Sequence, residues 1–201
     1  MKSLSGLSLF SGRTRNGCSL LAAVMVAGVC GRSALALTYD SSAANPAAPV
    51  DGPGNWDTVT PNWSDGSNDI LWPNTGSDAA VFGNGGTGGT VTVSSGITAG
   101  SITFNSLAAN SSYNLTGGPI TLGLANTAIT TNNTSSTSLT TIPDALISAV
   151  LQGTNGLTIT GPGTLTINAA NTYTGATTIS GGVILGIRGN AALNNAFGAN
   201  L

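Results

Sequence analysis

Residues 157–185, LTITGPGTLTINAANTYTGATTISGGVIL, contain the clearest structural signal in the chain. Apolar pairs such as Leu157/Ile159 and Leu165/Ile167 alternate with threonine, and this spacing of two predicts short β-strands. Glycine, proline and asparagine separate the strands and permit sharp turns. Strands this short bury too little apolar surface to be stable as isolated hairpins. We therefore expect them to stack on neighbouring turns of the chain.

The same stretch resembles the autotransporter-associated β-strand repeat. The residues that fall on the pattern of this repeat are Gly161, Gly163, Thr164, Leu165, Asn171, Thr172, Tyr173, Gly175, Thr177, Ile179 and Gly182. Two positions depart from the usual form, because Ala176 stands where glycine is common and Val183 where threonine is common. The resemblance implies a secreted, right-handed parallel β-helix of the passenger-domain kind, in which the motif residues are structural. It does not imply a catalytic activity.

Charge is distributed unevenly along the chain. Four of the five basic residues lie in the first 32 positions, whereas all seven acidic residues are aspartates that follow residue 36. From Leu37 onward, one arginine and seven aspartates give a formal net charge of 1 − 7 = −6. Nucleic-acid binding needs several cationic side chains, so we expect no nucleic-acid partner. The abundant Thr, Ser, Asn and Gly disfavour helices, and Thr favours strands.

Residues 1–36 have the pattern of a secretory signal peptide. Basic residues precede the apolar run 20–29, and Ala34 and Ala36 supply the small side chains required before the cleaved bond. A lipid anchor on Cys30 is the alternative interpretation. The apolar run is too short to span a bilayer comfortably, so no integral membrane segment is expected in the exported chain. The sequence thus predicts a protein that is extracellular or at the cell surface, without disulfides because both cysteines lie in the leader.

Residues 37–85 are predicted to form an irregular N-terminal segment that caps a solenoid. The segment contains the three tryptophans of the chain, Trp56, Trp63 and Trp72. A solenoid exposes its first turn, and a cap must cover the apolar core there. Tryptophan supplies a large apolar area for this purpose. The alternative is that the three rings lie exposed and stack on a carbohydrate.

Residues 86–201 are predicted to form the turns of the solenoid, with the recognised repeat at 157–185. Paired apolar positions recur through this region, and three strands per turn would give turns of ~20 to 28 residues. We interpret residues 144–151 as a strand, although their apolar spacing also fits a brief helix. Asn168, Asn171 and the many threonines are expected to form side-chain ladders that run from turn to turn.

Few catalytic sites can be built from this composition. The chain has no histidine or glutamate, and residues 37–201 also lack cysteine and lysine, so triads with a histidine base are excluded. Paired aspartates could hydrolyse a glycoside, and a polysaccharide lyase would have only Arg188 as its base. The aspartates concerned are Asp57, Asp65, Asp69 and Asp78, all in the predicted cap. We expect no enzyme activity and no cofactor.

Residues 65–69 place oxygen-bearing side chains at alternate positions, as a calcium-binding loop does. An Asx turn explains the same residues equally well, and no glutamate is present to complete a calcium loop.

Taken together, these features predict a non-catalytic, secreted or cell-surface β-helix, a stalk or passenger segment at the outer membrane with adhesion as its role. Its expected partner is an extracellular polysaccharide or another cell-surface protein. A carbohydrate-binding module that uses the tryptophans is the alternative, and a lyase or hydrolase is the third hypothesis.

Overall fold

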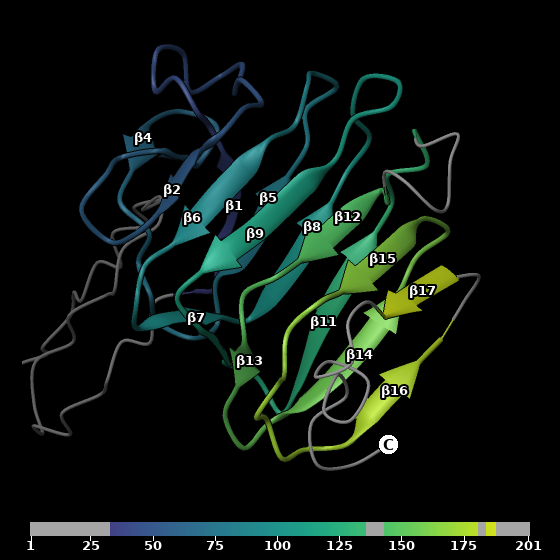
Figure 1. Cartoon of the computed structure of the whole chain (residues 1–201). Helices are drawn as coiled ribbons and strands as arrows, with labels where there is room; N and C mark the ends of the chain where they lie inside the picture. Colours follow the sequence, from purple (N-terminus) through teal and green to yellow (C-terminus); the bar gives the residue numbers. More distant parts are fainter. Residues whose placement is uncertain (1–32, 136–142, 181–183, 188–201) are drawn as a thin grey trace, which may run out of the picture. The chain divides into compact units, whose positions relative to one another are not determined.

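The computed structural model describes residues 33–135, 143–180 and 184–187. From Ala34 onward the chain forms one compact unit. The described residues of this unit contain seventeen strands and no helix, and the strands form three sheets (Figure 1). The predicted leader, residues 1–36, lies almost wholly outside the described residues.

The largest sheet, sheet A, has the strand order β16-β14-β11-β8-β5-β1-β3-β4. Neighbouring strands from β16 to β1 are parallel, whereas β3 and β4 join the sheet in antiparallel orientation. Its strands are β1 (Ala36–Tyr39), β3 (Trp63–Ser64), β4 (Asp69–Ile70), β5 (Ala79–Phe82), β8 (Ser101–Phe104), β11 (Asn126–Thr131), β14 (Gly156–Thr160) and β16 (Thr177–Ile179).

Two further sheets are parallel throughout, sheet B with the order β17-β15-β12-β9-β6-β2 and sheet C with the order β13-β10-β7. The strands of sheet B are β2 (Gly54–Trp56), β6 (Thr90–Val93), β9 (Tyr113–Gly117), β12 (Ala145–Ile147), β15 (Thr164–Ile167) and β17 (Ile184–Ile187). Those of sheet C are β7 (Ile97–Ala99), β10 (Ile120–Leu122) and β13 (Leu151–Gln152).

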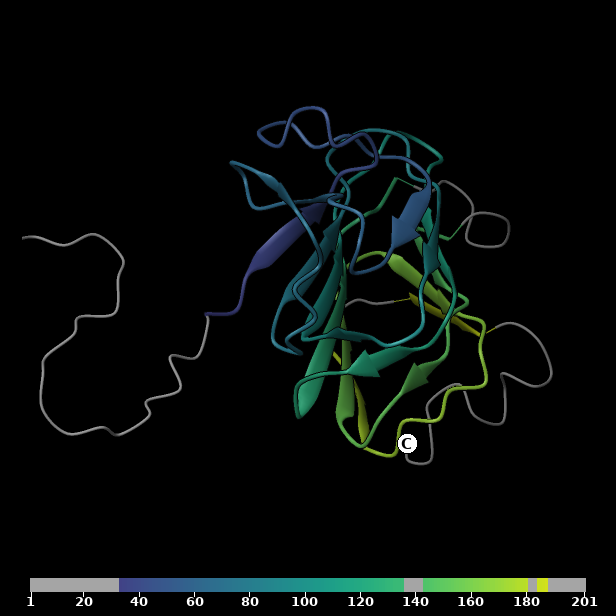
Figure 2. The same cartoon turned by 90° about the vertical axis from the view of Figure 1, so that its left-hand side faces the viewer.

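From β5 to β15 the chain visits the sheets in strict rotation, A, then B, then C (Figures 1 and 2). Each strand therefore pairs with the strand of the same sheet in the preceding pass. Between β15 and β16 the place of the sheet C strand is taken by an irregular segment, and the amide groups of Thr172 and Tyr173 donate to the Leu151 carbonyl of β13. The predicted all-β fold with parallel sheets is thus confirmed.

The apolar core consists of columns of side chains that stack from one pass to the next. The pairing register places the same inward position of each strand directly over its counterpart in the neighbouring strand, and every member of the columns is fully buried. The columns are Ala80, Ile102, Ile129 and Ile159 in sheet A, Leu115, Ile147 and Ile167 in sheet B, and Ile97, Ile120 and Leu151 in sheet C.

The passes differ in length. The pass from Ile159 to its partner Ile179 lies at the short end of the expected ~20 to 28 residues. The pass from Ile129 to its partner Ile159 is longer than that range, because residues 132–144 separate β11 from β12. Residues 144–151 contain β12 and the first residue of β13, so the strand interpretation of this segment is confirmed and the helical one is wrong.

Residues 37–85 are more regular than we expected from their turn-rich composition, since β2–β5 and most of β1 lie there. Strand β1 continues sheet A in parallel beside β5, and the hairpin β3–β4 is added on the other side of β1. Within the described residues, this edge of sheet A therefore ends in β4, a strand of only two residues.

Candidate functional site

All three tryptophans are buried. The exposed fractions of Trp56, Trp63 and Trp72 are 0, 0 and 2%. Trp56 ends β2, Trp63 begins β3 and Trp72 follows β4, so separate segments bring the three rings together. A sugar stacks on an exposed aromatic face, and none of these side chains presents one. The rings therefore do not form the exposed plane that the carbohydrate-binding interpretation requires.

The tryptophans contact one another and the first phenylalanines of sheet A. The ring centroids of Trp63 and Trp72 are 4.6 Å apart, and those of Trp56 and Trp63 are 5.2 Å apart. Phe82 lies 5.5 Å from Trp63 and stacks on Phe104 of the next pass at 5.7 Å. Each aromatic pair contributes about 0.5–1.5 kcal/mol beyond the burial of its area. We call Trp56, Trp63, Trp72 and Phe82, with Tyr39, the tryptophan cluster.

Several polar atoms inside the tryptophan cluster have no partner. The Trp72 Nε1 group donates to the carbonyl oxygen of Thr98 at 3.1 Å. In contrast, the Nε1 groups of Trp56 and Trp63 and the hydroxyl of Tyr39 are buried without a hydrogen bond. Leaving such a donor unsatisfied costs about 1–3 kcal/mol. The apolar area that the cluster buries must offset this cost.

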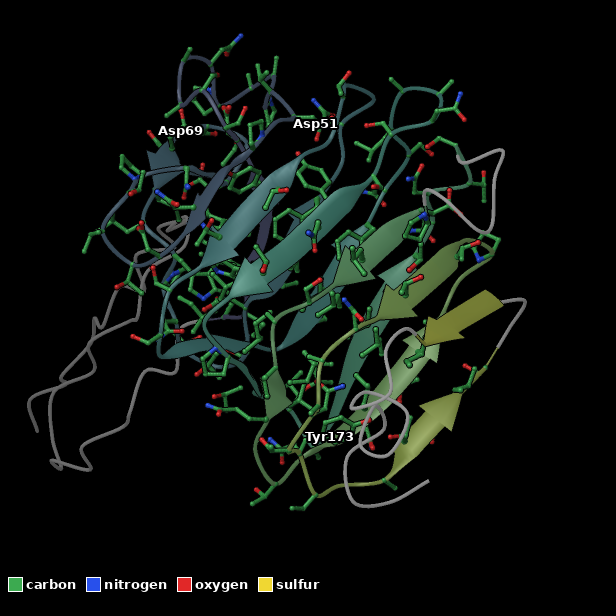
Figure 3. The ribbon with its side chains drawn as sticks, viewed as in Figure 1. Asp51, Asp69 and Tyr173 are labelled. Atoms are coloured by element: carbon green, nitrogen blue, oxygen red, sulfur yellow. The ribbon has the colours of Figure 1, made fainter. Side chains whose placement is uncertain are left out.

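Residues 65–68 form the turn between β3 and β4, and Asp69 is the first residue of β4. Figure 3 labels Asp69. Asp65 Oδ1 accepts hydrogen bonds from the amide groups of Asn68 at 2.7 Å and Ser67 at 2.9 Å, and these bonds lower the pKa of Asp65. Burial, followed by the charges of Asp40 and Asp65, raises the pKa of Asp69. The bonds are those of an Asx turn, the second of the two interpretations given for this segment.

The other aspartates of the predicted cap hold turns in place. Asp57 Oδ1 accepts from the amide groups of Val59 and Thr60. Asp78, only 1% exposed, accepts from Thr75 Oγ1 at 2.6 Å within its own loop. These carboxylates are thus engaged in separate turns. Among the described residues, no group of three or more histidine, cysteine or acidic side chains is arranged to hold a metal ion. Arg188, the only base considered for a lyase, lies outside the described residues.

The glycines of the repeat motif occupy positions that other residues could not. Gly161 has a φ of 110°, a left-handed conformation that L side chains rarely adopt, and a Cβ atom there would collide with the Thr131 carbonyl of the preceding pass. A Cβ atom added to Gly175 would likewise collide with the backbone of Asn155. Both glycines therefore allow one pass to approach the next. Gly182 lies outside the described residues.

The remaining motif residues divide into buried and exposed positions. Leu165 and Tyr173 are fully buried, and the Tyr173 hydroxyl lies 2.6 Å from Thr177 Oγ1. Thr172 is exposed, and Ile179 of the edge strand β16 is 45% exposed. Figure 3 shows Tyr173 at the β13–β16 end of the unit, away from Asp51 and Asp69. The motif residues and the tryptophans thus belong to different ends of the stacked sheets.

The two asparagines of the motif play different parts. Asn171 is 2% exposed, and its Oδ1 atom accepts a 2.8 Å hydrogen bond from the amide group of Leu151 in the preceding pass. Asn168 is exposed instead. The side chain of Asn171 therefore replaces the backbone partner that Leu151 would find in a regular sheet C strand.

Comparison with known proteins places the repeat in a family. The sequence model of the passenger-associated-transport-repeat family matches residues 157–185, the stretch singled out above. The chain carries an autotransporter-associated repeat. The matched residues include the two close-approach glycines, Gly161 and Gly175. They also include Asn171, whose side chain accepts the hydrogen bond from the Leu151 amide.

A second comparison relates a larger part of the chain to one curated protein. Over 150 residues, which are 72% of this chain, the sequence is 39% identical to the adhesin BmaC autotransporter of Brucella suis biovar 1 (strain 1330). The matched region is only 4% of the length of that adhesin. No solved structure matches the chain. In the described residues, no helix is both long and apolar enough to cross a membrane.

The asparagines of the repeat offer a direct test of the rung-to-rung bond. We expect Asn171→Ala to lower the free energy of unfolding by about 1–3 kcal/mol, because the buried amide of Leu151 loses its acceptor. The matched control, Asn168→Ala, removes the same side chain from an exposed position and should change stability by less than about 0.5 kcal/mol. Urea unfolding followed by circular dichroism measures both. Equal losses in the two variants would show that the Asn171 bond has no special role.

Buried tyrosines couple stability to alkaline pH. Burial, and then the charges of Asp40 and Asp57, raises the pKa of Tyr39 to about 12. Tyr113 donates to Asp51 Oδ1 at 2.8 Å, and burial is the main cause of its raised pKa. Burial likewise raises the pKa of Tyr173. These are the three tyrosines of the chain.

Because the folded-state pKa values are raised, the stabilisation is complete below the ordinary tyrosine pKa of about 10. It is lost as the pH rises from there through about 12, because only the unfolded chain ionises in that range. We therefore expect tyrosinate absorbance to appear together with unfolding, in one steep step. Absorbance and tryptophan emission recorded in the same alkaline titration test this. A gradual tyrosinate signal near pH 10 from a chain that is still folded would contradict the burial of these hydroxyls.

Proposed function

We propose that this chain is a segment of an autotransporter passenger domain, displayed at the cell surface and folded as a right-handed β-helix. The observation that carries the proposal is the rotation of the chain through three parallel sheets, combined with a passenger-associated transport repeat in the last described passes. A parallel β-helix stacks passes in this way, so each pass forms a template for the next.

The N-terminal end of the stack is proposed to be closed by a cap. Within the tryptophan cluster, Trp56 and Trp63 pack against Phe82, an inward residue of β5 in sheet A. The antiparallel hairpin β3–β4 occupies the edge of β1 that would otherwise offer backbone groups to another strand. A second link is Asp51, whose carboxylate accepts from the Tyr113 hydroxyl of β9 and from the amides of Asn84 and Gly86. These bonds attach the N-terminal loop to the later passes.

The proposed role is adhesive and non-catalytic. Asp57, Asp65 and Asp78 are engaged in turns, and the sequence offers no histidine, glutamate or lysine from residue 37 onward to act as a base. The relative with 39% identity is named an adhesin, and its name supports the same role for this chain. A rigid stack of strands suits this role, because it exposes large regular faces and fills its interior with side chains.

Display at the cell surface can be tested in bacteria that produce the chain in its natural setting. An epitope inserted after Val59, which is 77% exposed, should be labelled by antibody on intact cells and removed by added protease. A periplasmic protein with the same epitope serves as the control for leakage. Labelling of the chain only after the outer membrane is permeabilised would refute display at the surface.

One observation favours carbohydrate binding as a second candidate function. The unpartnered Nε1 groups of Trp56 and Trp63 and the Tyr39 hydroxyl are donors that sugar hydroxyls could satisfy if the tryptophan cluster opened.

Tryptophan emission distinguishes the two candidates, because all three tryptophans belong to the cluster. A structural cluster predicts blue-shifted emission that acrylamide quenches poorly and that no soluble polysaccharide alters. Carbohydrate binding predicts that one polysaccharide shifts the emission or protects it from acrylamide. The unfolded chain in urea provides the fully quenched reference.

A further inference from the structure

Three side-chain oxygen atoms near the first strands of sheet A are buried and accept no hydrogen bond from the described residues. They are Oδ2 of Asp40, Oδ1 of Asn62 and Oδ1 of Asp69. Asp40 is fully buried, and Asn62 is only 5% exposed. The amide of Asn62 is held in place, because its Nδ2 group donates to the Asn55 carbonyl. A buried acceptor normally has a partner in the protein, in water or in a bound ion, and the described protein supplies none here.

The three side chains lie on one face of the sheet corner formed by β1, β3 and β4. Tyr39 pairs with Trp63 across β1 and β3, and both rings point into the core. Asp40 and Asn62 continue this ladder, since the Asp40 amide donates to the Asn62 carbonyl at 2.9 Å. In β4, Asp69 directly precedes the partner of Trp63. Because alternate residues of a strand face opposite sides, Asp40, Asn62 and Asp69 all face outward, away from the rings.

The loop of residues 41–50 covers this outward face. Asp40 Oδ1 accepts hydrogen bonds from three amide groups of the loop, at 2.9, 3.2 and 3.2 Å. Ser64, which faces outward between Asn62 and Asp69, donates from Oγ to the carbonyl of Pro46 in the same loop. The loop thereby occupies one oxygen of Asp40 and leaves the other, Oδ2, buried without a donor.

The carboxylates of this face have no cationic partner among the described residues, which contain no lysine, arginine or histidine. Burial, followed by the charges of Asp40 and Asp65, raises the pKa of Asp69, so the Asp40 carboxylate acts on Asp69 across the face. Buried carboxylates without a counter-charge are unfavourable. A water molecule donates only two hydrogen bonds and leaves the charge uncompensated. A cation can satisfy all three oxygens and compensate both charges.

We propose that Asp40, Asn62 and Asp69 bind one calcium ion, and we call these three side chains the Asp40 site. Calcium prefers carboxylate and amide oxygens and accepts six to eight oxygen ligands in flexible arrangements, so water molecules complete its shell. Magnesium requires a near-ideal octahedron, and the softer transition metals favour nitrogen or sulfur ligands. The bound ion attaches the loop 41–50 and the hairpin β3–β4 to β1.

The Asp40 site differs from the calcium loop considered for residues 65–69. The two share only Asp69, and the Oδ1 atom of Asp65 is occupied by the amide groups of its Asx turn. The site contains two carboxylates and one side-chain amide, so it is not a group of three acidic side chains. The inference concerns the N-terminal segment alone and does not depend on display at the cell surface.

Calorimetric titration of the purified full chain with calcium chloride tests the proposal. With few protein ligands, the Kd is expected on the order of 0.1–1 mM, the range of extracellular calcium modules. Saturating calcium should also raise the urea midpoint relative to the same chain in EDTA at equal ionic strength, because the ion binds only the folded state. Magnesium chloride at the same concentration should give a clearly smaller shift.

Asp40→Asn keeps the Oδ1 acceptor for the loop but removes the negative charge, and it should weaken calcium binding at least about tenfold. The matched control is Asp65→Asn, which removes a charge from the neighbouring exposed turn and should leave the Kd within about threefold. Asp69→Asn, at a partly exposed position, provides a second test of the site if Asp40→Asn does not fold. Tryptophan emission in EDTA shows which variants are folded.

No binding heat and no calcium-dependent shift of the urea midpoint in the unaltered chain would overturn the proposal. Equal shifts with calcium and magnesium would reduce the effect to general screening and would also overturn it. Loss of binding in Asp65→Asn, with unchanged binding in folded Asp40→Asn, would move the ion to the turn 65–68 and reject the Asp40 site. Unchanged affinity in both Asp40→Asn and Asp69→Asn would reject it as well.

Discussion

Parallel hydrogen bonding between successive passes is the interaction on which the whole structure depends. A strand of only a few residues is unstable alone. Here most strands pair with a strand of an earlier pass on one side and with a strand of a later pass on the other side. The register is fixed because a shift by one residue would turn Ile129 outward and the neighbouring Thr130 inward. Glycines at the bends, such as Gly161, allow the backbones of two passes to approach closely enough for this pairing.

The same pairing creates a difficulty at the first pass, because among the described residues β1 has no earlier parallel strand to pair with. The proposed cap, residues 37–85, meets both needs of that end. The hairpin β3–β4 covers the backbone edge of β1 in antiparallel orientation, and the tryptophans cover the apolar interior. The cost is visible in the buried Nε1 groups of Trp56 and Trp63, which have no partner. Apolar coverage has evidently outweighed polar satisfaction at this end.

Because side chains fill the interior, any function must use the outer faces or the ends. The outer faces are chemically distinct even though all are rich in threonine. In sheets B and C the outer polar groups bond with one another, as Ser148 does with Asn114 and Gln152 with Thr121. On sheet A, Thr177 of β16 lies instead against the Tyr173 hydroxyl, at 2.6 Å. A stacked fold can thus keep one core and vary its binding surface by small changes at outward positions.

The sequence was sufficient to predict the strands, the stacking and the repeat, because strand periodicity and turn residues are local properties. Residues 157–185 carried both the pattern and the family match. The sequence could not establish the exposure of Trp56, Trp63 and Trp72, since burial depends on contacts between segments far apart in the chain. Nor could it separate Asn171 from Asn168, which differ only in whether another pass lies beside them.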